Sequence, residues 1–554
     1  MALAADITLD TSPVDYVMIA AYFAVVLGVG ILARRSVRTS MDFLLAGRSM
    51  PAWITGLAFL SANLGAIEVL GMTANGAAYG LAPTHYYWIG AIPAMVVLGL
   101  IMMPFYYGAK VRSVPEYLRL RFGKPTHLLQ SLTFAVASIL IAGINLYALA
   151  LIVNALIGWP IWISIAMAAV IVLAYTFFGG LSAAIYNEVL QFFVIVAALL
   201  PLTFVGLHRV GGWDGLTSNV ANSRLGAEAM HAWGGTGLDN TSHPYGNWIG
   251  IAVGLGFVLS FGYWTTNFAE VQRALSAKDM SAARRTPLIA AFPKMLLPII
   301  VILPGVLAVI LVPGIGDGTL TYNDALPALI NELLPNGLIG LAIAGLLASF
   351  MAGMAANLSA FNTVVTYDIW QPYVRPDKDD SHYLKVGRTA TTAGVVVAIG
   401  AAFLAAGYNN IGDYLQTLSS FFNAPLFATF IVGMFIARIT PWAGFAGLVS
   451  GMLGAAGVYF AHRTDLVAFS SDQNAAFWGA GVAFAVDVVV MLLVTAVTAP
   501  KPVEELTGLV WSTTDRSTYR KPWREHLGRN WYQSVPVLSV IALVSCLSLN
   551  LIFG

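Results

Sequence analysis

The sequence predicts an all-α protein that crosses a lipid bilayer many times, and three observations lead to this prediction. Hydrophobic residues make up 58% of the 554 residues and charged residues only 10%, with a mean hydropathy of +0.77. Polar side chains are therefore too few to cover a soluble globule of this size. About fourteen apolar runs are long enough, at roughly 20 residues each, to cross the hydrocarbon core. Positive charges gather in alternate loops.

The first apolar run, 14–33, continues directly into Arg34 and Arg35, and the residues before it carry no basic charge. We therefore expect a membrane helix there and not a cleaved signal peptide. Short joins at 158–160 and 440–441 separate later runs and support the count. The expected spans are 14–33, 51–79, 83–107, 127–157, 160–178, 186–207, 247–270, 286–313, 324–365, 387–406, 410–436, 440–461, 477–499 and 533–552.

The distribution of Lys and Arg predicts the orientation of these spans. With the N-terminus outside, all but four of the 28 Lys and Arg residues fall in inner loops; the exceptions are Arg209, Arg224, Arg463 and the intramembrane Lys294. Because inner loops carry the positive charge of membrane proteins, both termini are expected outside. Residues 208–246 then form an outer cap, and the basic segment 500–532 lies in the cytoplasm, either as a surface helix or as a connector.

Composition and motifs exclude several classes of function. A formal net charge of +1 argues against nucleic acid as a partner, because phosphate binding requires a basic excess. The sequence lacks GxxxxGK[ST], HExxH and CxxC patterns, so neither an enzyme nor an organic cofactor is expected. The single cysteine, Cys546, cannot form an internal disulfide. The expected partners are the bilayer and a small-molecule solute.

Two apolar spans are interrupted by small and polar residues, at 61–71 and at 260–267. Hydrocarbon offers no hydrogen-bond partner to unpaired backbone, so a break at that depth lines a cavity enclosed by protein. Paired breaks of this kind are typical of binding sites in transporters. The sequence therefore favours a transporter over a passive channel.

Ionisable side chains inside spans are candidates for function, because each costs about 2.5–3.5 kcal/mol on insertion scales. They are Glu68, Glu188, Glu270, Lys294 and Asp487. Glu68 lies in the first interruption, and Lys294 follows Pro293 in a later span. The structural alternatives are a carboxylate held by backbone N–H groups and an ion pair between Glu68 and Lys294. Glu188 and Glu270 lie near inner span ends, where snorkelling or a loop salt bridge is the structural alternative; for Glu270 this alternative is expected, with Arg273 nearby.

Aromatic residues stand at the outer end of the third span and at the second break. The first group comprises His85, Tyr86, Tyr87 and Trp88, and the second Tyr263 and Trp264. An interfacial belt is the structural alternative for such residues. Flat rings with polar edges also suit a polar organic ligand, so His85, Tyr87 and Tyr263 are candidates for solute contact, Tyr263 as a ligand contact or gate.

Six stretches between 43 and 370 resemble the solute:sodium symporter family, and within it the sodium/galactose and sodium/glucose cotransporters. They are FLLAGRSMPAWITGLAFLSANLGAIEVLGM (43–72), VRSVPEYLRLRFG (111–123), GGLSAAIYNEVLQ (179–191), YWTTNFAEVQRALSAKDMSAA (263–283), AAFPKMLLP (290–298) and TYDIW (366–370). The resemblance implies a LeuT-like 5+5 inverted repeat over 51–207 and 247–436. One helix, 14–33, precedes the repeats, and three helices follow within 440–552.

The resemblance also implies a solute site. Tyr263 is similar to an aromatic gate beneath the sugar, and Lys294 to a lysine that binds it. At three further positions of the family's site this chain has different residues: Ser260 for an Asn, Glu68 for a Gln and Tyr87 for a Glu. Another binding Gln is expected at Gln416 or Thr417.

The implied sodium site differs more. The family would combine backbone carbonyls at Ser61, Leu64 and Ser349 with two serine hydroxyls, and these two positions are Ala352 and Gly353. Neither residue offers a side-chain oxygen, which a hard cation needs. A second ion site is a candidate, formed by Glu188, Ser359, Asn362 and Thr363. Alternatively, Glu68 carries a proton.

The sequence thus predicts a symporter of the cell membrane that works by alternating access. It would import a small polar organic solute, most simply a sugar or related compound, with sodium as the coupling ion. One alternative is proton-coupled or uncoupled transport by the same fold. The other, from a different class, is a membrane sensor that binds the solute without transporting it. Which solute is carried, the stoichiometry and the oligomeric state cannot be read from the sequence.

Overall fold

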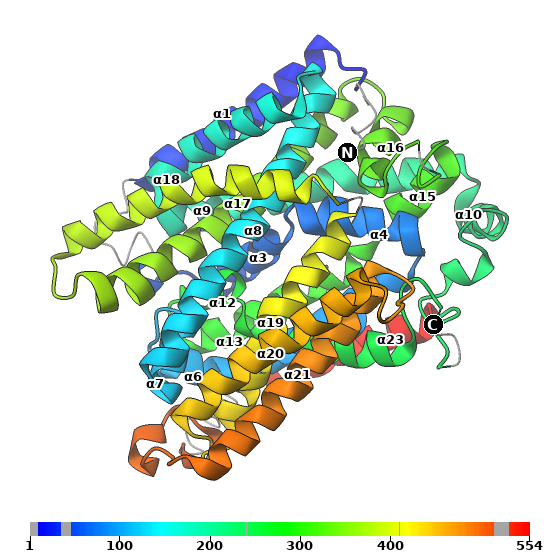
Figure 1. Cartoon of the computed structure of the whole chain (residues 1–554). Coiled ribbons are helices and arrows are strands. Elements are labelled where there is room, and N and C mark those ends of the chain that lie inside the picture. Colours follow the sequence, from blue (N-terminus) through cyan, green and yellow to red (C-terminus); the bar gives the residue numbers. More distant parts are fainter. Residues whose placement is uncertain (1–8, 35–45, 239–241, 318, 409, 515–530) are drawn as a thin grey trace.

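The computed structural model describes residues 9–34, 46–238, 242–317, 319–408, 410–514 and 531–554. These residues form a bundle of helices (Figure 1). No β-sheet occurs among them, where the extended backbone makes only isolated bridges such as that between Met50 and Ala277. The expectation of an all-α protein is therefore confirmed.

The first half of the chain contains one leading helix, one broken helix, several short segments and two long helices. In order they are α1 (Pro13–Arg34), α3 (Ala52–Asn63), η2 (Ile67–Gly71), α4 (Met72–Tyr79), η4 (Tyr86–Ala91), α5 (Ile92–Val97), η5 (Leu98–Met102), α6 (Met103–Gly108), α7 (Val114–Phe122), α8 (Lys124–Ile157), α9 (Ile161–Arg209) and α10 (Gly212–Ala221).

The second half contains two more bent helices and a series of long ones. They are η7 (Gly250–Ser260), α11 (Phe261–Thr266), α12 (Phe268–Leu275), α13 (Met280–Leu296), α14 (Pro298–Val301), α15 (Leu303–Leu311), α16 (Ala325–Leu333), α17 (Leu338–Thr363), η9 (Val364–Val374), α18 (Asp380–Ala405), α19 (Ile411–Phe435), α20 (Pro441–Arg463), α21 (Asp472–Val497) and α23 (Val535–Ile552). Segments η2, η4, η5, η7 and η9 are π-helical, a wide-turn geometry frequent at functional sites.

Each expected span coincides with an apolar helix. In the described residues, nine helices are long and apolar enough to cross a membrane, and up to twelve if each of three bent pairs counts as one span. The expected spans 14–33 and 160–178 correspond to the shorter apolar helices Pro13–Val26 and Ile161–Val170.

Two span boundaries differ from the sequence prediction. Helix α9 runs unbroken through both 160–178 and 186–207, because no proline or turn interrupts its backbone before Pro201. Its 49 residues are far more than the roughly 20 that one crossing needs. The expected span 324–365 is divided into α16 and α17, since Pro335 and the left-handed Gly337 end the helical path between them.

Both ends of the chain lie on the side of the 208–246 segment. The Leu9 N–H donates to the Ala155 carbonyl at 2.9 Å, near the join between α8 and α9. The Ala232 N–H, within 208–246, donates to the Phe553 carbonyl at 2.7 Å. In Figure 1 the C-terminus accordingly lies in the half that holds α10, α15 and α16.

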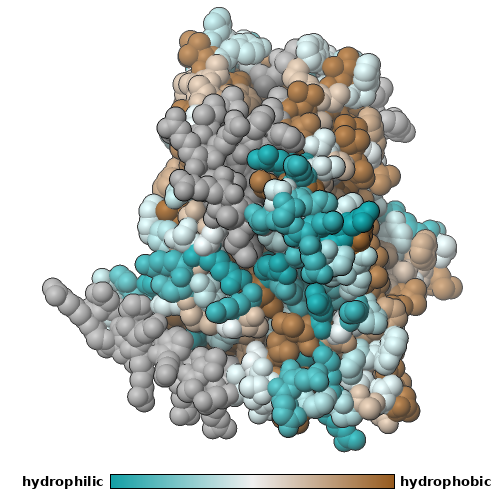
Figure 2. All heavy atoms as spheres, turned by 90° about the vertical axis from the view of Figure 1, so that its left-hand side faces the viewer, coloured by the Kyte–Doolittle hydropathy of each residue, from teal (hydrophilic) through white to brown (hydrophobic). Residues whose placement is uncertain are grey.

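The opposite end of the bundle is polar. Hydrophilic residues gather over the middle of the face seen from the left of Figure 1 (Figure 2). Exposed basic residues at this end are Arg119 and Lys124 at the join of α7 and α8, and Arg375 and Lys378 before α18. The Lys501 ammonium donates to the Leu120 carbonyl at 2.9 Å, so residue 501 also lies here; residues 515–530 of the basic segment are outside the described part.

Candidate solute-binding site

The first interruption is a break between α3 and η2, where the paired helices bend by 60°. The backbone leaves the helix at Leu64 (φ −72°, ψ 45°). The freed Ala66 N–H donates to the Asn145 side-chain oxygen of α8 at 2.9 Å, and the Leu64 carbonyl accepts from the Ser349 hydroxyl of α17. Neighbouring helices therefore supply the hydrogen bonds that the break releases.

The second interruption is a break between α11 and α12, with a bend of 47°. Asn267 takes an extended conformation there, and its side chain accepts from the Ala269 N–H at 3.0 Å. A side-chain cap of this kind satisfies a donor at the start of the new helix. Both breaks predicted from the sequence are thus present.

A third bend, between α13 and α14, was not predicted. Helix Met280–Leu296 turns by 46° into Pro298–Leu311. Proline at position 298 cannot donate the backbone hydrogen bond that would continue α13, and prolines are the usual cause of such kinks. Lys294 lies in the last turn of α13, directly before this bend.

The three bends bring Glu68 and Lys294 together. The Lys294 ammonium lies 2.5 Å from the Glu68 Oε1 atom and also donates to the Asn63 side-chain oxygen. The Lys294 and Glu68 side chains are 0% and 1% exposed, so the pair is closed off from both faces of the protein. The ion pair that the sequence left as an alternative is therefore present.

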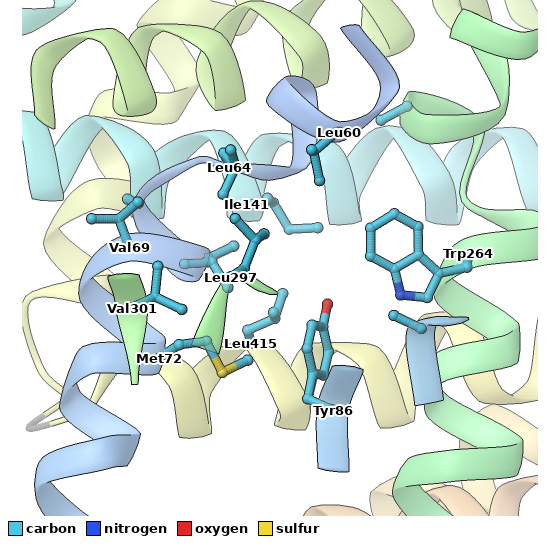
Figure 3. Close-up of a cluster of buried hydrophobic side chains, with 14 of the residues drawn as sticks. Leu60, Leu64, Val69, Met72, Tyr86, Ile141, Trp264, Leu297, Val301 and Leu415 are labelled. Carbon is cyan, nitrogen blue, oxygen red and sulfur yellow. The ribbon is translucent and has the colours of Figure 1, made fainter. Parts of the chain in front are cut away.

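Aromatic rings enclose the Lys294 ammonium. Its Nζ atom lies 4.8 Å from the ring centre of Trp264, 5.0 Å from that of Tyr87 and 5.7 Å from that of Tyr86. Cations are attracted to the faces of such rings, most strongly where water is excluded. Figure 3 shows Tyr86 and Trp264 near each other in the buried cluster that also holds Leu60 and Leu64 of the first broken helix.

Several buried polar atoms around this pair find no hydrogen-bond partner among the described residues. They are Glu68 Oε2, the hydroxyls of Tyr86, Tyr87 and Ser260, and Trp264 Nε1. Each of these residues is at most 3% exposed. Buried polar atoms are rarely left unpaired without a reason such as an absent ligand. Together they offer one carboxylate acceptor, one N–H donor and three hydroxyls that can do either.

A hydrogen-bonded chain leads from the ion pair to the second break. The Asn63 amide donates to the Tyr263 hydroxyl at 3.1 Å, and that hydroxyl donates to Glu270 Oε1 at 3.0 Å. Asn63 alone therefore connects Lys294 to Tyr263 in this series of hydrogen bonds. Asn63, Tyr86 and Trp264 were not among the candidate residues, although each lies beside one of them in the sequence or in the first interruption.

Three candidates are not part of this hydrogen-bonded network. The His85 imidazole hydrogen-bonds the Ala232 carbonyl at 2.9 Å and packs on Trp233, both in the 208–246 segment. Gln416 is buried on α19, and the Thr417 hydroxyl donates to the Asp413 carbonyl of its own helix at 3.0 Å. None of these three residues forms a described contact with Lys294 or Glu68.

The place where the family resemblance implies a sodium site, at Ser61, Leu64, Ser349, Ala352 and Gly353, is tightly packed. Glycine at 353 faces Gly65 so closely that an added Cβ would lie 2.8 Å from the Gly65 Cα atom and 2.5 Å from the Asn145 side-chain oxygen. Ala352 is fully buried, and the Ser61 hydroxyl has no partner among the described residues. Since Ser349 donates to the Leu64 carbonyl, protein groups already occupy part of the proposed ligand set.

The residues of the second ion position form a separate polar network. Glu188 pairs with Arg273 through both carboxylate oxygens. The expected salt bridge between Glu270 and Arg273 is therefore wrong, because the Arg273 guanidinium reaches across to α9 instead. The Thr363 hydroxyl donates to the Ser359 carbonyl at 2.8 Å, and the Asn362 amide donates to the Thr391 hydroxyl at 3.1 Å. Gln272 connects Arg273 to Thr363.

Comparison with known proteins assigns the family. The model of the sodium:solute symporter family matches residues 43–451, which is well over half of the chain. This chain belongs to the sodium:solute symporter family. It is 29% identical over 460 residues to a sodium/glucose cotransporter of Vibrio parahaemolyticus, covering 79% of this chain and 84% of that protein. It is also 29% identical over 555 residues to sodium/glucose cotransporter 4 of Danio rerio, covering 93% and 84%.

Solved structures show the fold. A Na⁺-coupled sialic acid symporter in a substrate-bound, outward-open state superposes with a TM-score of 0.74 at 19% identity, covering 89% of this chain and 99% of that one. Mhp1, a nucleobase-cation-symport-1 family transporter in a closed conformation, gives 0.50 at 15% identity, covering 86% and 97%. The LeuT-like fold is thus shown, and the protein is a multi-pass membrane symporter of small solutes and not an enzyme.

Proposed function

We propose that this symporter imports a small, uncharged, polyhydroxylated solute, a sugar or a close relative of one, across the cell membrane by alternating access. The observation that carries the proposal is the Glu68–Lys294 pair, buried at the junction of three helix bends and surrounded by unpaired polar atoms. A solute entering this space would meet aromatic faces and hydrogen-bonding groups together, as polar organic ligands require.

Charge favours an uncharged solute. An anion would be attracted by Lys294 but repelled by Glu68 only 2.5 Å away, and a cation would meet the reverse. A polyol instead donates hydrogen bonds to the free Glu68 Oε2 atom and accepts them from Trp264 Nε1 and the hydroxyls. The relatives named as sodium/glucose cotransporters support this class of solute.

In the proposed site each residue has a distinct role. Glu68 and Lys294 bind hydroxyls of the solute, Tyr87 and Ser260 complete its hydrogen bonds, and Tyr263 forms the gate toward the inner side. Gln416 and Thr417 contribute from α19, which packs against η2 and α11. His85, near the start of the span Ala82–Gly108, hydrogen-bonds the Ala232 carbonyl of the 208–246 segment. It therefore acts at the outer entrance.

We assign the two repeats to 51–207 and 247–436, with 14–33 leading and three helices within 440–552 following. Both termini and the 208–246 segment are placed outside, and 500–532 in the cytoplasm. The exposed basic residues at the polar end of the bundle, Arg119, Lys124, Arg375 and Lys378, support this orientation, since inner loops are basic.

Sodium is the proposed coupling ion, and its position is a choice between two places. The first is at Ser61, Leu64 and Ser349, weakened by Ala352 and Gly353. The second is at Glu188, Ser359, Asn362 and Thr363. In the first, the Ser349 hydroxyl must turn from the Leu64 carbonyl to the ion. In the second, Arg273 must release Glu188.

Uptake into proteoliposomes tests the function. Radiolabelled D-glucose and D-galactose would be offered with an inward sodium gradient, with equal sodium on both sides and with potassium in place of sodium. We expect accumulation only with the sodium gradient. Uptake of equal extent under all three conditions would reject sodium coupling.

Ala352 and Gly353 lack the hydroxyl groups that a sodium site would use. This favours a second candidate function, in which the same fold carries the solute with a proton or without any ion. If Glu68 carried that proton, Glu68→Gln would abolish uptake driven by a pH gradient. In the structure Glu68 already has Lys294 as its counter-ion, which makes it the less suitable of the buried carboxylates for this role.

A further inference from the structure

Glu270 is a buried carboxylate with no counter-ion among the described residues. It lies in the first turn of α12, directly after the second break, and is 1% exposed. Its Oε1 atom accepts from the Tyr263 hydroxyl at 3.0 Å. Its Oε2 atom forms no hydrogen bond with any described residue, and no described cation lies within ion-pairing distance.

The charges of the surrounding core do not balance. Five ionisable groups, all at most 1% exposed, belong to the solute site, to Glu270 and to the separate network of Arg273 and Glu188: the acids are Glu68, Glu188 and Glu270 and the bases Lys294 and Arg273. Lys294 pairs with Glu68, and Arg273 pairs with Glu188. One negative charge remains whenever all five groups are ionised.

Arg273 and Lys294 already donate to other groups, so neither acts as the counter-ion of Glu270. Arg273 donates through Nε and Nη2 to Glu188, and through Nη1 to the Ala269 carbonyl and the Gln272 side chain. Lys294 donates to Glu68 and Asn63, and its remaining face lies against aromatic rings.

The elements packed against α12 bring no other positive charge to Glu270. They are α3, α11, α13 and α17. Helices α3 and α17 contain no titratable residue, and α11 contributes Tyr263. On α13, Arg284 donates to the Gly99 and Leu100 carbonyls and Arg285 to Ser281 and Gln533. The remaining titratable neighbours are Tyr86 of η4 and Glu188 of α9, which bring no positive charge.

We propose that Glu270 is a proton-binding site of this transporter, with the proton on Oε2. A protonated Glu270 keeps Oε1 as the acceptor for Tyr263 and leaves two ion pairs and one neutral acid in the core. Since an isolated charge buried away from water is strongly unfavourable, the carboxyl group takes up a proton instead.

A proton fits this position better than a metal ion. Sodium and other hard cations need several oxygen ligands. The only described group that hydrogen-bonds the Glu270 carboxylate is the Tyr263 hydroxyl, and the described residues contain no cluster of three acidic, His or Cys side chains suited to a metal.

The position of Glu270 connects this proton to the solute site. Loss of the proton would place a negative charge beside the Tyr263 hydroxyl, which accepts from Asn63, which in turn accepts from Lys294. Protonation and solute binding are then linked, each changing the affinity for the other. This inference goes beyond the proposed function, because it holds for any solute and does not depend on where sodium binds.

Infrared spectroscopy of the full-length protein in detergent tests the proposal without a solute. At neutral pH the wild type should show a carbonyl stretch of a protonated carboxylic acid that is absent from Glu270→Gln. The control Glu332→Gln, which removes a surface carboxylate paired with Arg209, should keep the band. Identical carboxylic-acid bands in wild type and Glu270→Gln would overturn the proposal.

The pH dependence of thermal unfolding gives an independent readout. Unfolded glutamate is ionised above pH ~4.3, so a folded state that holds the proton gains stability as the pH falls toward that value and loses it as the pH rises. The unfolding equilibrium of the wild type should change by up to about tenfold per pH unit relative to Glu270→Gln. Parallel curves would contradict the proposal. So would failure of Glu270→Gln to fold, because the amide mimics the protonated acid.

Discussion

Lys294 is the residue on which the proposed solute site depends. Its ammonium group is fully buried, with one carboxylate, one amide oxygen and three aromatic rings around it. A buried pair is held in place less by its own net stability than by the high cost of removing one member. Binding of a solute can therefore rearrange the hydrogen bonds of the pair while both charges stay together.

Removing one member of the pair should destabilise the protein strongly. We expect Lys294→Met to cost about 3–5 kcal/mol, because it leaves Glu68 as an uncompensated buried charge. Thermal unfolding in detergent measures this loss. The double variant Glu68→Gln/Lys294→Met should be more stable than the sum of the single losses predicts, by on the order of 1–3 kcal/mol. Additive losses would show that the two side chains do not interact in solution.

One ion pair, between Glu270 and Arg273, was predicted wrongly from the sequence. A spacing of three residues along a helix favours a pair between Glu270 and Arg273, and this pair was expected. Arg273 instead binds Glu188, which is 85 residues away in the sequence. The tertiary contact prevails because two carboxylate oxygens of α9 meet the guanidinium side by side, the geometry that arginine prefers. No local pattern could predict that Glu270 would be left without a counter-ion.

At the scale of elements, the broken helices create the site. The first break is held by α8 and α17, which provide Asn145 and Ser349 to the freed backbone groups. Glycines at 65 and 353 allow the break after α3 to lie close against α17 at this point. Close packing here fixes the direction of the bend and thus the position of Glu68.

A methyl group at position 353 should therefore be destabilising. The added Cβ of Gly353→Ala would lie 2.5 Å from the Asn145 side-chain oxygen and 2.8 Å from the Gly65 Cα atom. We expect a loss of about 1–3 kcal/mol from the forced shift, measured by thermal unfolding. The matched control is Gly481→Ala in α21, where a Cβ meets no atom within 4 Å. Equal stability of the two variants would contradict the packing described.

The elements also differ in how well the sequence predicted them. Polar and small residues at 61–71 and 260–267 interrupt long apolar runs, so both breaks could be located. The third bend could not, because the interior of the run 286–313 holds prolines at 287, 293, 298 and 304. Proline predicts a kink but does not specify which of four positions bends. The continuous α9 was missed because the small residues at 179–185 (GGLSAAI) resemble a turn between two spans, although they lie within the helix.

At the scale of the molecule, the two ends of the bundle differ in character. Both termini and the 208–246 segment lie at one end, and the basic surface of α7 and the loop before α18 lies at the other. The segregation of Lys and Arg predicted this arrangement of ends, because a wrong number of spans would have mixed them.

Cysteine labelling tests the orientation. The only native cysteine, Cys546, is buried, and Cys546→Ala provides a background without thiols. On that background Asn222→Cys, in the 208–246 segment, should react with a membrane-impermeant maleimide in intact cells. Lys378→Cys, at the basic end, should react only after permeabilisation. The reverse pattern would place the termini inside.

The most direct test of the central claim, a solute site closed around Glu68 and Lys294, is a ligand-stabilisation screen. Sugars, carboxylates and amines would each be added to the wild type and to Lys294→Met in sodium and in potassium, and the unfolding temperature would be recorded. We predict that a sugar raises the unfolding temperature of the wild type but not of Lys294→Met. Equal stabilisation of both proteins, or stabilisation of the wild type by charged compounds alone, would contradict this account.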